Sequence, residues 1–204
     1  MMTRWMRPWG LAACAAALFL LPAATAGAQK GTAPKVPATV EAILDATLDH
    51  VWQLTDLHWH KGEYNHILNL YKVVVAGWPD QVEAYANGGW LLWSMNRDAE
   101  AIALYEQGIK ANPKSAYMFD ELGQHYNRKK DWPKAIRYLE QAAARPDVQP
   151  LTLHTLAHCY ERTGRLKESL KTWERAAADP HNAARLAARN HAARIKRLLA
   201  ERSQ

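Results

Sequence analysis

The sequence predicts an all-α protein, a solenoid of four antiparallel helical hairpins followed by a C-terminal capping helix. Three observations carry this prediction. The chain repeats a pattern of small, bulky and turn-forming residues at a fixed spacing without a gap. A proline closes each repeat, where it cannot continue a helix. The segment 182–201 then has a helical period, with apolar residues on one side and arginines on the other.

The segment 1–28 is typical of a secretory signal peptide. Arg4 and Arg7 precede an apolar run over 11–21, and small residues follow up to Ala28, after which we expect cleavage. The apolar run is shorter than the roughly 20 residues that span a bilayer. Cys14 completes the letters of a lipoprotein box, but most of the apolar residues follow it. Lipidation and a retained anchor are therefore the alternatives, and the protein is predicted to be periplasmic or secreted.

Residues 29–40 form a predicted flexible leader, because two prolines and one glycine interrupt any apolar period. The helical period starts near Glu41, which makes the first helix longer than those that follow. Once the signal is removed, Cys159 is the remaining cysteine, so no intramolecular disulfide can form. Its place in an apolar helical stretch predicts a buried thiol.

Four repeat frames align over 41–180, starting at residues 48, 82, 116 and 150. Each frame predicts a helix, a turn, a second helix and a proline. The turns fall at Lys61-Gly62, Asn96-Arg97, Lys130-Asp131 and Thr163-Gly164. The second helices carry a small or medium residue at Ile67, Ala101, Ala135 and Ser169, and a large one at Tyr71, Tyr105, Leu139 and Trp173. Because small residues let paired helices approach closely, each hairpin can stack on the next and bury a continuous core.

This pattern resembles the tetratricopeptide repeat (TPR) family. The resemblance rests on segments such as Leu122-Gly123-Gln124-His125-Tyr126 and Ala135-Ile136-Arg137-Tyr138-Leu139, and it covers residues 48 to about 180. The first unit departs most, with Thr55 and Ile67 where the family prefers Gly or Ala. The resemblance implies a superhelix whose first helices line an inner groove that holds extended or helical peptides.

Transferred by phase, the resemblance also implies which residues line that groove. They are Trp52, Asp56, Trp59 and His60 in the first unit, Asn87, Trp90 and Trp93 in the second, Asp120, Gln124, Asn127 and Arg128 in the third, and His154, His158, Glu161 and Arg162 in the fourth. Aromatic residues dominate binding energetics, and truncating one at a hot spot costs about 2 kcal/mol or more. We therefore expect the groove tryptophans to bind a partner, with packing against neighbouring units as the alternative.

The excess of positive charge is concentrated at the C-terminal end of the chain. Between Gln29 and Pro180 the sequence has 18 Lys or Arg against 19 Asp or Glu, whereas the segment 181–204 has six against one. This segment is predicted to be a basic capping helix and tail, whose arginines form a solvated face. Contact with an anionic membrane through this tail is the alternative. No nucleic-acid partner is predicted, because an exported protein rarely meets nucleic acid.

Enzyme signatures are missing from the sequence. It contains no phosphate-cradling glycine loop and no Gly-x-Ser-x-Gly elbow, so we predict no catalytic residue and no cofactor. His154 and His158 share a helical face, but no third ligand is fixed by spacing, so no metal is predicted. The predicted function is a non-catalytic protein–protein interaction scaffold of the bacterial cell envelope that holds a peptide segment of another envelope protein. The alternative is a cell-wall glycan-binding module that uses the same tryptophans and the basic tail.

Overall fold

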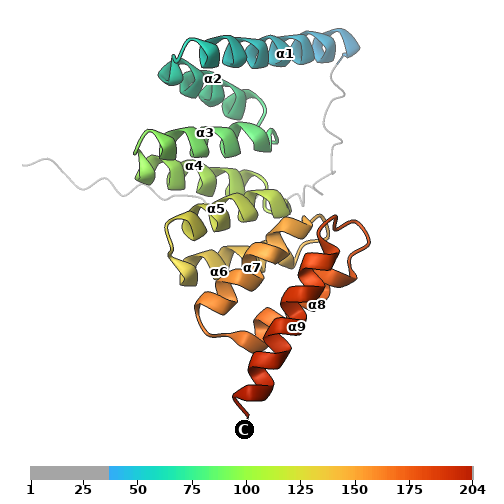
Figure 1. Cartoon of the computed structure of the whole chain (residues 1–204). Helices are drawn as coiled ribbons and strands as arrows, with labels where there is room; N and C mark the ends of the chain where they lie inside the picture. The colour runs from blue at the N-terminus through green and yellow to red at the C-terminus, as the bar shows by residue number, and fades with distance from the viewer. Residues whose placement is uncertain (1–36, 204) are drawn as a thin grey trace, which may run out of the picture. The chain divides into compact units, whose positions relative to one another are not determined.

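The computed structural model describes residues 37–203, which form nine α-helices and no strand (Figure 1). The helices are α1 (Ala38–His60), α2 (Tyr64–Gly77), α3 (Val82–Ser94), α4 (Asp98–Ala111), α5 (Ala116–Arg128), α6 (Trp132–Ala143), α7 (Pro150–Arg162), α8 (Leu166–Ala178) and α9 (Arg185–Glu201). Each helix contacts the next, so the first eight pair into four hairpins with α9 behind them. The all-α solenoid class is confirmed. The predicted signal peptide, its cleavage site and most of the leader lie outside the described residues.

The first helix begins earlier than the sequence period indicated. Residues 38–40, predicted to end the leader, belong to α1, which therefore starts three residues before Glu41. Pro37 directly precedes the helix, where a residue without an N–H costs no intrahelical hydrogen bond. Over residues 37–203, no helix combines the length and the apolar composition that crossing a membrane requires.

Each hairpin turns on one residue in the left-handed region of backbone conformation. The φ angles are +72° at Gly62, +60° at Asn96, +60° at Lys130 and +76° at Gly164. These four residues are spaced at the repeat period and lie at the turns that the sequence predicted. The regular spacing shows that all four hairpins share one backbone geometry, the atypical first unit included.

The residues that repeat in phase form the core between paired helices. The small or medium positions Ile67, Ala101, Ala135 and Ser169 are buried, as are the large positions Tyr71, Tyr105, Leu139 and Trp173. Hydrogen bonds to backbone carbonyls then join each unit to the one before it. They run from Asn112 Nδ2 to Pro79 O (2.8 Å), from Arg145 Nη2 to Pro113 O (2.7 Å) and from Arg175 Nη1 to Ala143 O (2.8 Å).

The helices lie in two layers of different spacing. The first helices of the second, third and fourth hairpins touch in succession, since α3 contacts α5 and α5 contacts α7. The second helices are further apart and leave hollows between α2 and α4 and between α6 and α8. In a curved stack the closer layer is the inner one, so the first helices form the inner layer, as the resemblance implied.

Helix α9 closes the C-terminal end of the array. Its Ala188 and Ile195 are fully buried, while Arg185, Arg189 and Arg197 are exposed. This arrangement is the predicted capping helix, with three of its arginines on the solvated side, whereas Arg194 bonds to Glu161 of α7. An amphipathic helix of this kind covers the apolar face that the last hairpin would otherwise expose.

Candidate functional site

The inner layer is hollowed at its N-terminal end, between α1 and α3. One hollow of about 310 Å³ is lined by Trp52, Thr55, Asp56, Trp59, Tyr71 and Asn87. A second hollow of about 420 Å³ shares Trp52 and Asn87 with it and extends to Gln81 and Glu83. We call these two hollows together the N-terminal groove. Trp52 forms its floor, because this indole is half-buried and its ring centroid lies 5.8 Å from that of Tyr71.

Two tryptophans stand exposed at the edge of this groove. Trp59 and Trp90 come from successive first helices, and their ring centroids lie 6.0 Å apart at an interplanar angle of 36°. Their exposed fractions are 44% and 43%, although large aromatic side chains are usually well buried. Tyr64 supports Trp59 from the turn side, with ring centroids 5.5 Å apart. Adjacent exposed indoles of this kind are typical of a binding surface.

Trp93 differs from Trp90 because α5 covers part of it. The guanidinium carbon of Arg128 lies 4.9 Å from the Trp93 ring centroid, and the His125 ring approaches edge-on at 6.4 Å. Trp93 is therefore half-buried between two units, which is the packing alternative for this residue. Arg128 is exposed and remains accessible at the same place.

The middle of the inner layer is polar and joins α5 to α7. Gln124 Nε2 donates to Asp120 Oδ1 at 3.2 Å and to Thr155 Oγ1 at 2.9 Å. Asn127 Oδ1 accepts from the Cys159 thiol at 3.4 Å. Asp120, Gln124 and Asn127 thus all bond within the chain. The Cys159 thiol is buried, and burial raises its pKa to about 11, so at neutral pH it is not a nucleophilic thiolate.

Two adjacent carboxyl groups of α5 lie beside this polar region. Burial raises the pKa of Asp120, against hydrogen bonds from Thr152 and Gln124. Burial also raises the pKa of Glu121, and the neighbouring charge of Asp120 adds to the effect while Arg128 opposes it. A raised pKa means that the surroundings disfavour the carboxylate form. A cation placed against these groups would relieve that cost.

This shift predicts that Glu121→Gln stabilises the protein at neutral pH. A carboxyl group whose pKa is higher in the folded state binds more protons there than in the unfolded chain, so stability falls as pH rises from the ordinary carboxyl range through the raised value. The amide cannot ionise and escapes this loss. Urea unfolding at pH 7 should show Glu121→Gln to be the more stable protein, and the advantage should shrink towards pH 4. An advantage that is constant with pH would show that the ionisation of Glu121 is not its cause.

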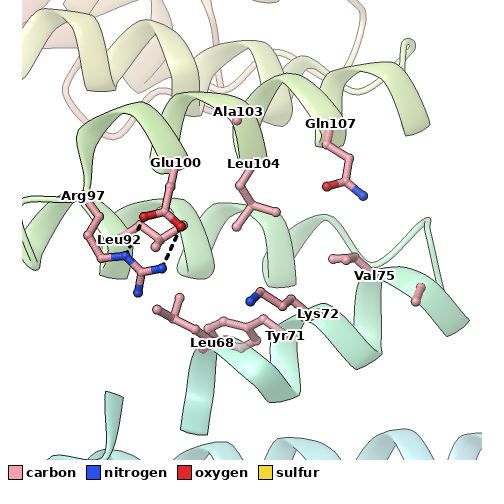
Figure 2. A pocket seen from close by; sticks show the side chains of 11 residues that line it. Leu68, Tyr71, Lys72, Val75, Leu92, Arg97, Glu100, Ala103, Leu104 and Gln107 are labelled. Carbon is pink, nitrogen blue, oxygen red and sulfur yellow. Dashed lines mark hydrogen bonds and ion pairs between the residues drawn. The ribbon is translucent and has the colours of Figure 1, made fainter. Parts of the chain in front are cut away.

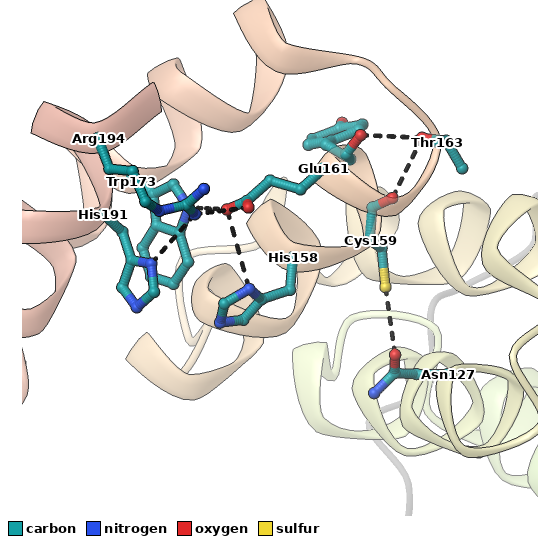
Figure 3. A network of polar contacts seen from close by, with 9 residues as sticks. Asn127, His158, Cys159, Glu161, Thr163, Trp173, His191 and Arg194 are labelled. Atoms are coloured by element: carbon teal, nitrogen blue, oxygen red, sulfur yellow. Dashed lines mark hydrogen bonds and ion pairs between the residues drawn. The ribbon is translucent and has the colours of Figure 1, made fainter. Parts of the chain in front are cut away.

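Helix α9 packs on α8, and its Arg194 reaches Glu161 of α7 (Figure 3). Glu161 accepts from Trp173 Nε1 at 2.9 Å and from Arg194 Nη2 at 2.6 Å. Burial alone would raise the pKa of Glu161, but these hydrogen bonds hold it below its usual range. The indole of Trp173 is fully buried and stacks on His191 of α9, with ring centroids 4.4 Å apart at 11°.

The two histidines of the fourth unit belong to the same cluster. His154 Nε2 lies 2.9 Å from Asn182 Nδ2, and burial lowers the pKa of this histidine. His158 stays half-exposed at the edge, with its ring centroid 4.8 Å from that of Trp173. Of the predicted partner-binding residues of this unit, Glu161 thus bonds to the capping helix, and His154 lies beside Asn182 in the connection that leads to it. His158 and Arg162 of the same helix remain exposed.

Two features of the structure were not predicted. His125 is fully buried, with Nε2 3.0 Å from Asp98 Oδ1, and Lys129 pairs with the same carboxylate. The second is a hollow of about 420 Å³ between α2 and α4 (Figure 2). Leu68, Val75 and Leu104 form its apolar walls. Arg97 and Glu100 pair at 2.6 Å on its rim. In the sequence, the residues of both features differ from others only by their position within the repeat. That position predicts packing between helices and nothing more specific.

A stack of helical hairpins that share one backbone geometry defines an all-α repeat protein. Tetratricopeptide repeat models match residues 82–115, which hold α3 and α4, and residues 119–150, which hold most of α5 and all of α6. The chain thus contains tetratricopeptide repeats, in agreement with the resemblance of its sequence to that family. Repeats of this family generally serve as non-catalytic scaffolds for protein–protein interaction.

Solved structures support the same fold. The chain is similar to PilF of Pseudomonas aeruginosa, with a TM-score of 0.58 and 15% identity over 78% of this chain and 71% of that one. It is similar to YrrB, described as a TPR protein with an unusual peptide-binding site, with a TM-score of 0.55 and 18% identity over 81% and 86%. TTC0263 of Thermus thermophilus gives 0.53 and 23% over 72% and 80%. At these identities the likeness shows the fold alone. No curated protein sequence matches the chain significantly.

Proposed function

We propose that this protein is a non-catalytic interaction scaffold of the bacterial cell envelope, and that its N-terminal groove holds a peptide segment of a partner protein. The observation that carries the proposal is the exposed pair Trp59 and Trp90 above a hollow floored by Trp52. The envelope location rests on the sequence of residues 1–28. The similarity to YrrB, a TPR protein with a peptide-binding site, supports a peptide as the kind of ligand.

The charge of the groove indicates what the segment carries. Among the residues that line the two hollows, Asp56 and Glu83 are acidic and none is Lys or Arg. Asp120 and Glu121 add two carboxyl groups on the neighbouring α5. A Lys or Arg of the partner would pair with these groups, and its cation would be attracted to an indole face within about 6 Å of the ring centroid. The fitting segment therefore combines an apolar anchor with at least one basic residue.

A capture experiment tests this function. The wild-type protein, crosslinked in native envelopes, should retain a partner that mass spectrometry identifies, and the Trp59→Ala, Trp90→Ala double variant should lose it. A labelled peptide from the partner should then bind the double variant at least about 30-fold more weakly, since one hot-spot truncation costs about 2 kcal/mol. Val73→Ala, which truncates an exposed apolar residue of α2, is the matched control and should bind normally.

The other outcomes have distinct meanings. Equal capture by wild type and double variant, with helicity unchanged in both, would show that the groove is not the binding site. Recovery of glycan without protein would favour the cell-wall glycan module, because sugar rings also stack on exposed indoles. In that case soluble peptidoglycan fragments should shift the tryptophan fluorescence of the wild type but not of the double variant.

A further inference from the structure

The turn of the first hairpin brings together three side chains that can bind a metal ion. His58 comes from the last turn of α1, Glu63 from the connection, and His66 from the first turn of α2. Their ligand atoms all lie within 4.8 Å of one another. Glu63 Oε2 is 2.6 Å from His58 Nδ1 and 4.0 Å from His66 Nδ1. The two imidazole rings stand nearly perpendicular, at 85° with centroids 5.1 Å apart.

The backbone fixes these three positions. Gly62 takes a left-handed conformation, and its N–H donates to Trp59 O at 3.0 Å. The N–H of Glu63 donates to His58 O at 3.0 Å, and the N–H of His66 donates to Glu63 O at 2.9 Å. The turn is therefore closed by hydrogen bonds on both sides of Glu63, so the three side chains leave an ordered backbone.

The same turn positions carry different chemistry in the other three hairpins. Where the first hairpin has Glu63 and His66, the others have opposite charges that form ion pairs. These pairs are Arg97 with Glu100, Asp131 with Lys134, and Arg165 with Glu168. Where the first hairpin has His58, the others have Leu92, Tyr126 and Tyr160. The first hairpin thus replaces a repeated ion pair and a packing residue with a set of possible metal ligands.

We propose that His58, Glu63 and His66 bind one divalent zinc-type ion. Two imidazole nitrogens and one carboxylate oxygen, with water in the fourth position, are a ligand set typical of zinc. With bonds of about 2.0–2.1 Å, tetrahedral ligand atoms lie about 3.3 Å apart. The distances of 2.6 and 4.0 Å to Glu63 bracket this value, so small side-chain rotations complete the site. Mg²⁺ and Ca²⁺, which prefer oxygen ligands, fit it poorly.

The ion would tie α1 to α2 beside the N-terminal groove. His58 precedes Trp59 and Glu63 precedes Tyr64, and these two aromatic rings contact each other at 5.5 Å. Holding the His58 side chain would help to keep its neighbour Trp59 in the position where it meets Trp90. The metal site does not depend on the proposed function, because it is defined by ligand chemistry alone. His154 and His158, the pair that the sequence singled out, are instead packed around Trp173.

Zinc titration of tag-free, chelator-treated protein tests the proposal. Calorimetry should show one Zn²⁺ per chain, no binding of Mg²⁺, and a higher melting temperature when zinc is present. His58→Ala and His66→Ala should each weaken zinc binding at least about tenfold, because even outer partners of metal ligands contribute about 10–100-fold. Glu63→Gln should also weaken it, while both histidines remain in place.

His60→Ala is the matched control. His60 is exposed at the end of α1 and lies 3.6 Å from Asp56 instead of Glu63, so its removal should leave zinc binding unchanged. Circular dichroism of each variant checks that the helices are intact. Two results would overturn the proposal: a wild type that takes up no zinc, or zinc uptake that survives in both His58→Ala and His66→Ala. In the second case the ion would be held elsewhere on the chain.

Discussion

Replacing Trp173 with alanine should destabilise the protein by about 3–5 kcal/mol, the usual cost of truncating a fully buried tryptophan. Its indole is completely inaccessible to solvent and contacts both α7 and α9. The substitution also removes the Nε1 donor of Glu161, a half-buried carboxylate that would keep one hydrogen bond, from Arg194, and His158 at 3.8 Å. Urea unfolding followed by circular dichroism measures the loss.

The matched comparison is Trp90→Ala, which removes the same side chain from an exposed site. Because Trp90 is 43% exposed, this variant should stay within about 1 kcal/mol of wild type. The α9 helix should fray in Trp173→Ala, which proteolysis would detect as early cleavage after α8. Equal stabilities of the two variants would show that Trp173 does not support the C-terminal end of the array.

Gly89→Ala should destabilise the protein by about 1–3 kcal/mol, although alanine is the better helix former. A Cβ atom at Gly89 would lie 2.5 to 2.8 Å from three atoms of the Tyr105 ring. That ring is fully buried and has His125 against it, with centroids 5.6 Å apart, so it cannot move aside. Helices α3 and α4 would have to separate. Thermal or urea unfolding measures the effect.

Gly77→Ala is the same substitution with the opposite expected sign. Gly77 is the last residue of α2, and a Cβ atom there would meet no atom within 4 Å. Alanine should therefore stabilise the protein by about 0.5–1 kcal/mol through helix propensity alone. If both substitutions stabilised, helix propensity would outweigh packing at Gly89, and close helix approach would not explain the glycine.

The repeat spacing predicted the hairpins because the same positions of every repeat pack between its two helices. The turn residues and the buried positions of the second helices follow from the spacing alone, as the left-handed Asn96 and Lys130 and the buried Trp173 show. The first-unit departures Thr55 and Ile67 did not disturb this, since both are buried in phase with the others. Local pattern and tertiary packing agree throughout the array.

The groove could be predicted only in part, because the position of a residue within its repeat does not say which residue of the next repeat it contacts. Successive first helices are offset by about one turn. Trp59 meets Trp90 and not its repeat equivalent Trp93, and Gln124 bonds to Thr155 and not to His158. A contact between two units depends on how they stack, which no single repeat encodes. Because of the offset between successive first helices, Trp59 pairs with Trp90 at the surface, whereas Trp93 packs on α5.

The packing of α9 on the fourth hairpin could not be predicted for a different reason. The segment after Pro180 has an amphipathic period, but the period does not say where α9 docks. Its docking places His191 and Arg194 over Trp173 and Glu161. Repeat phase predicted Glu161 to be a groove residue, and in the structure Glu161 bonds to Arg194 of this non-repeat helix. The metal-ligand set at the first turn was missed because its members come from two helices and the turn between them.

Site-specific photocrosslinking tests the central claim, that the N-terminal groove holds the partner, most directly. A crosslinking amino acid replaces Asn87, an exposed residue that lines both hollows, or in a parallel protein Asn69, an exposed residue of α2. Irradiated envelopes should give a partner adduct from position 87 and none from position 69, and the adduct should disappear in the Trp59→Ala, Trp90→Ala background. Adducts from position 69 alone, or an adduct at position 87 that survives the loss of both tryptophans, would contradict the claim.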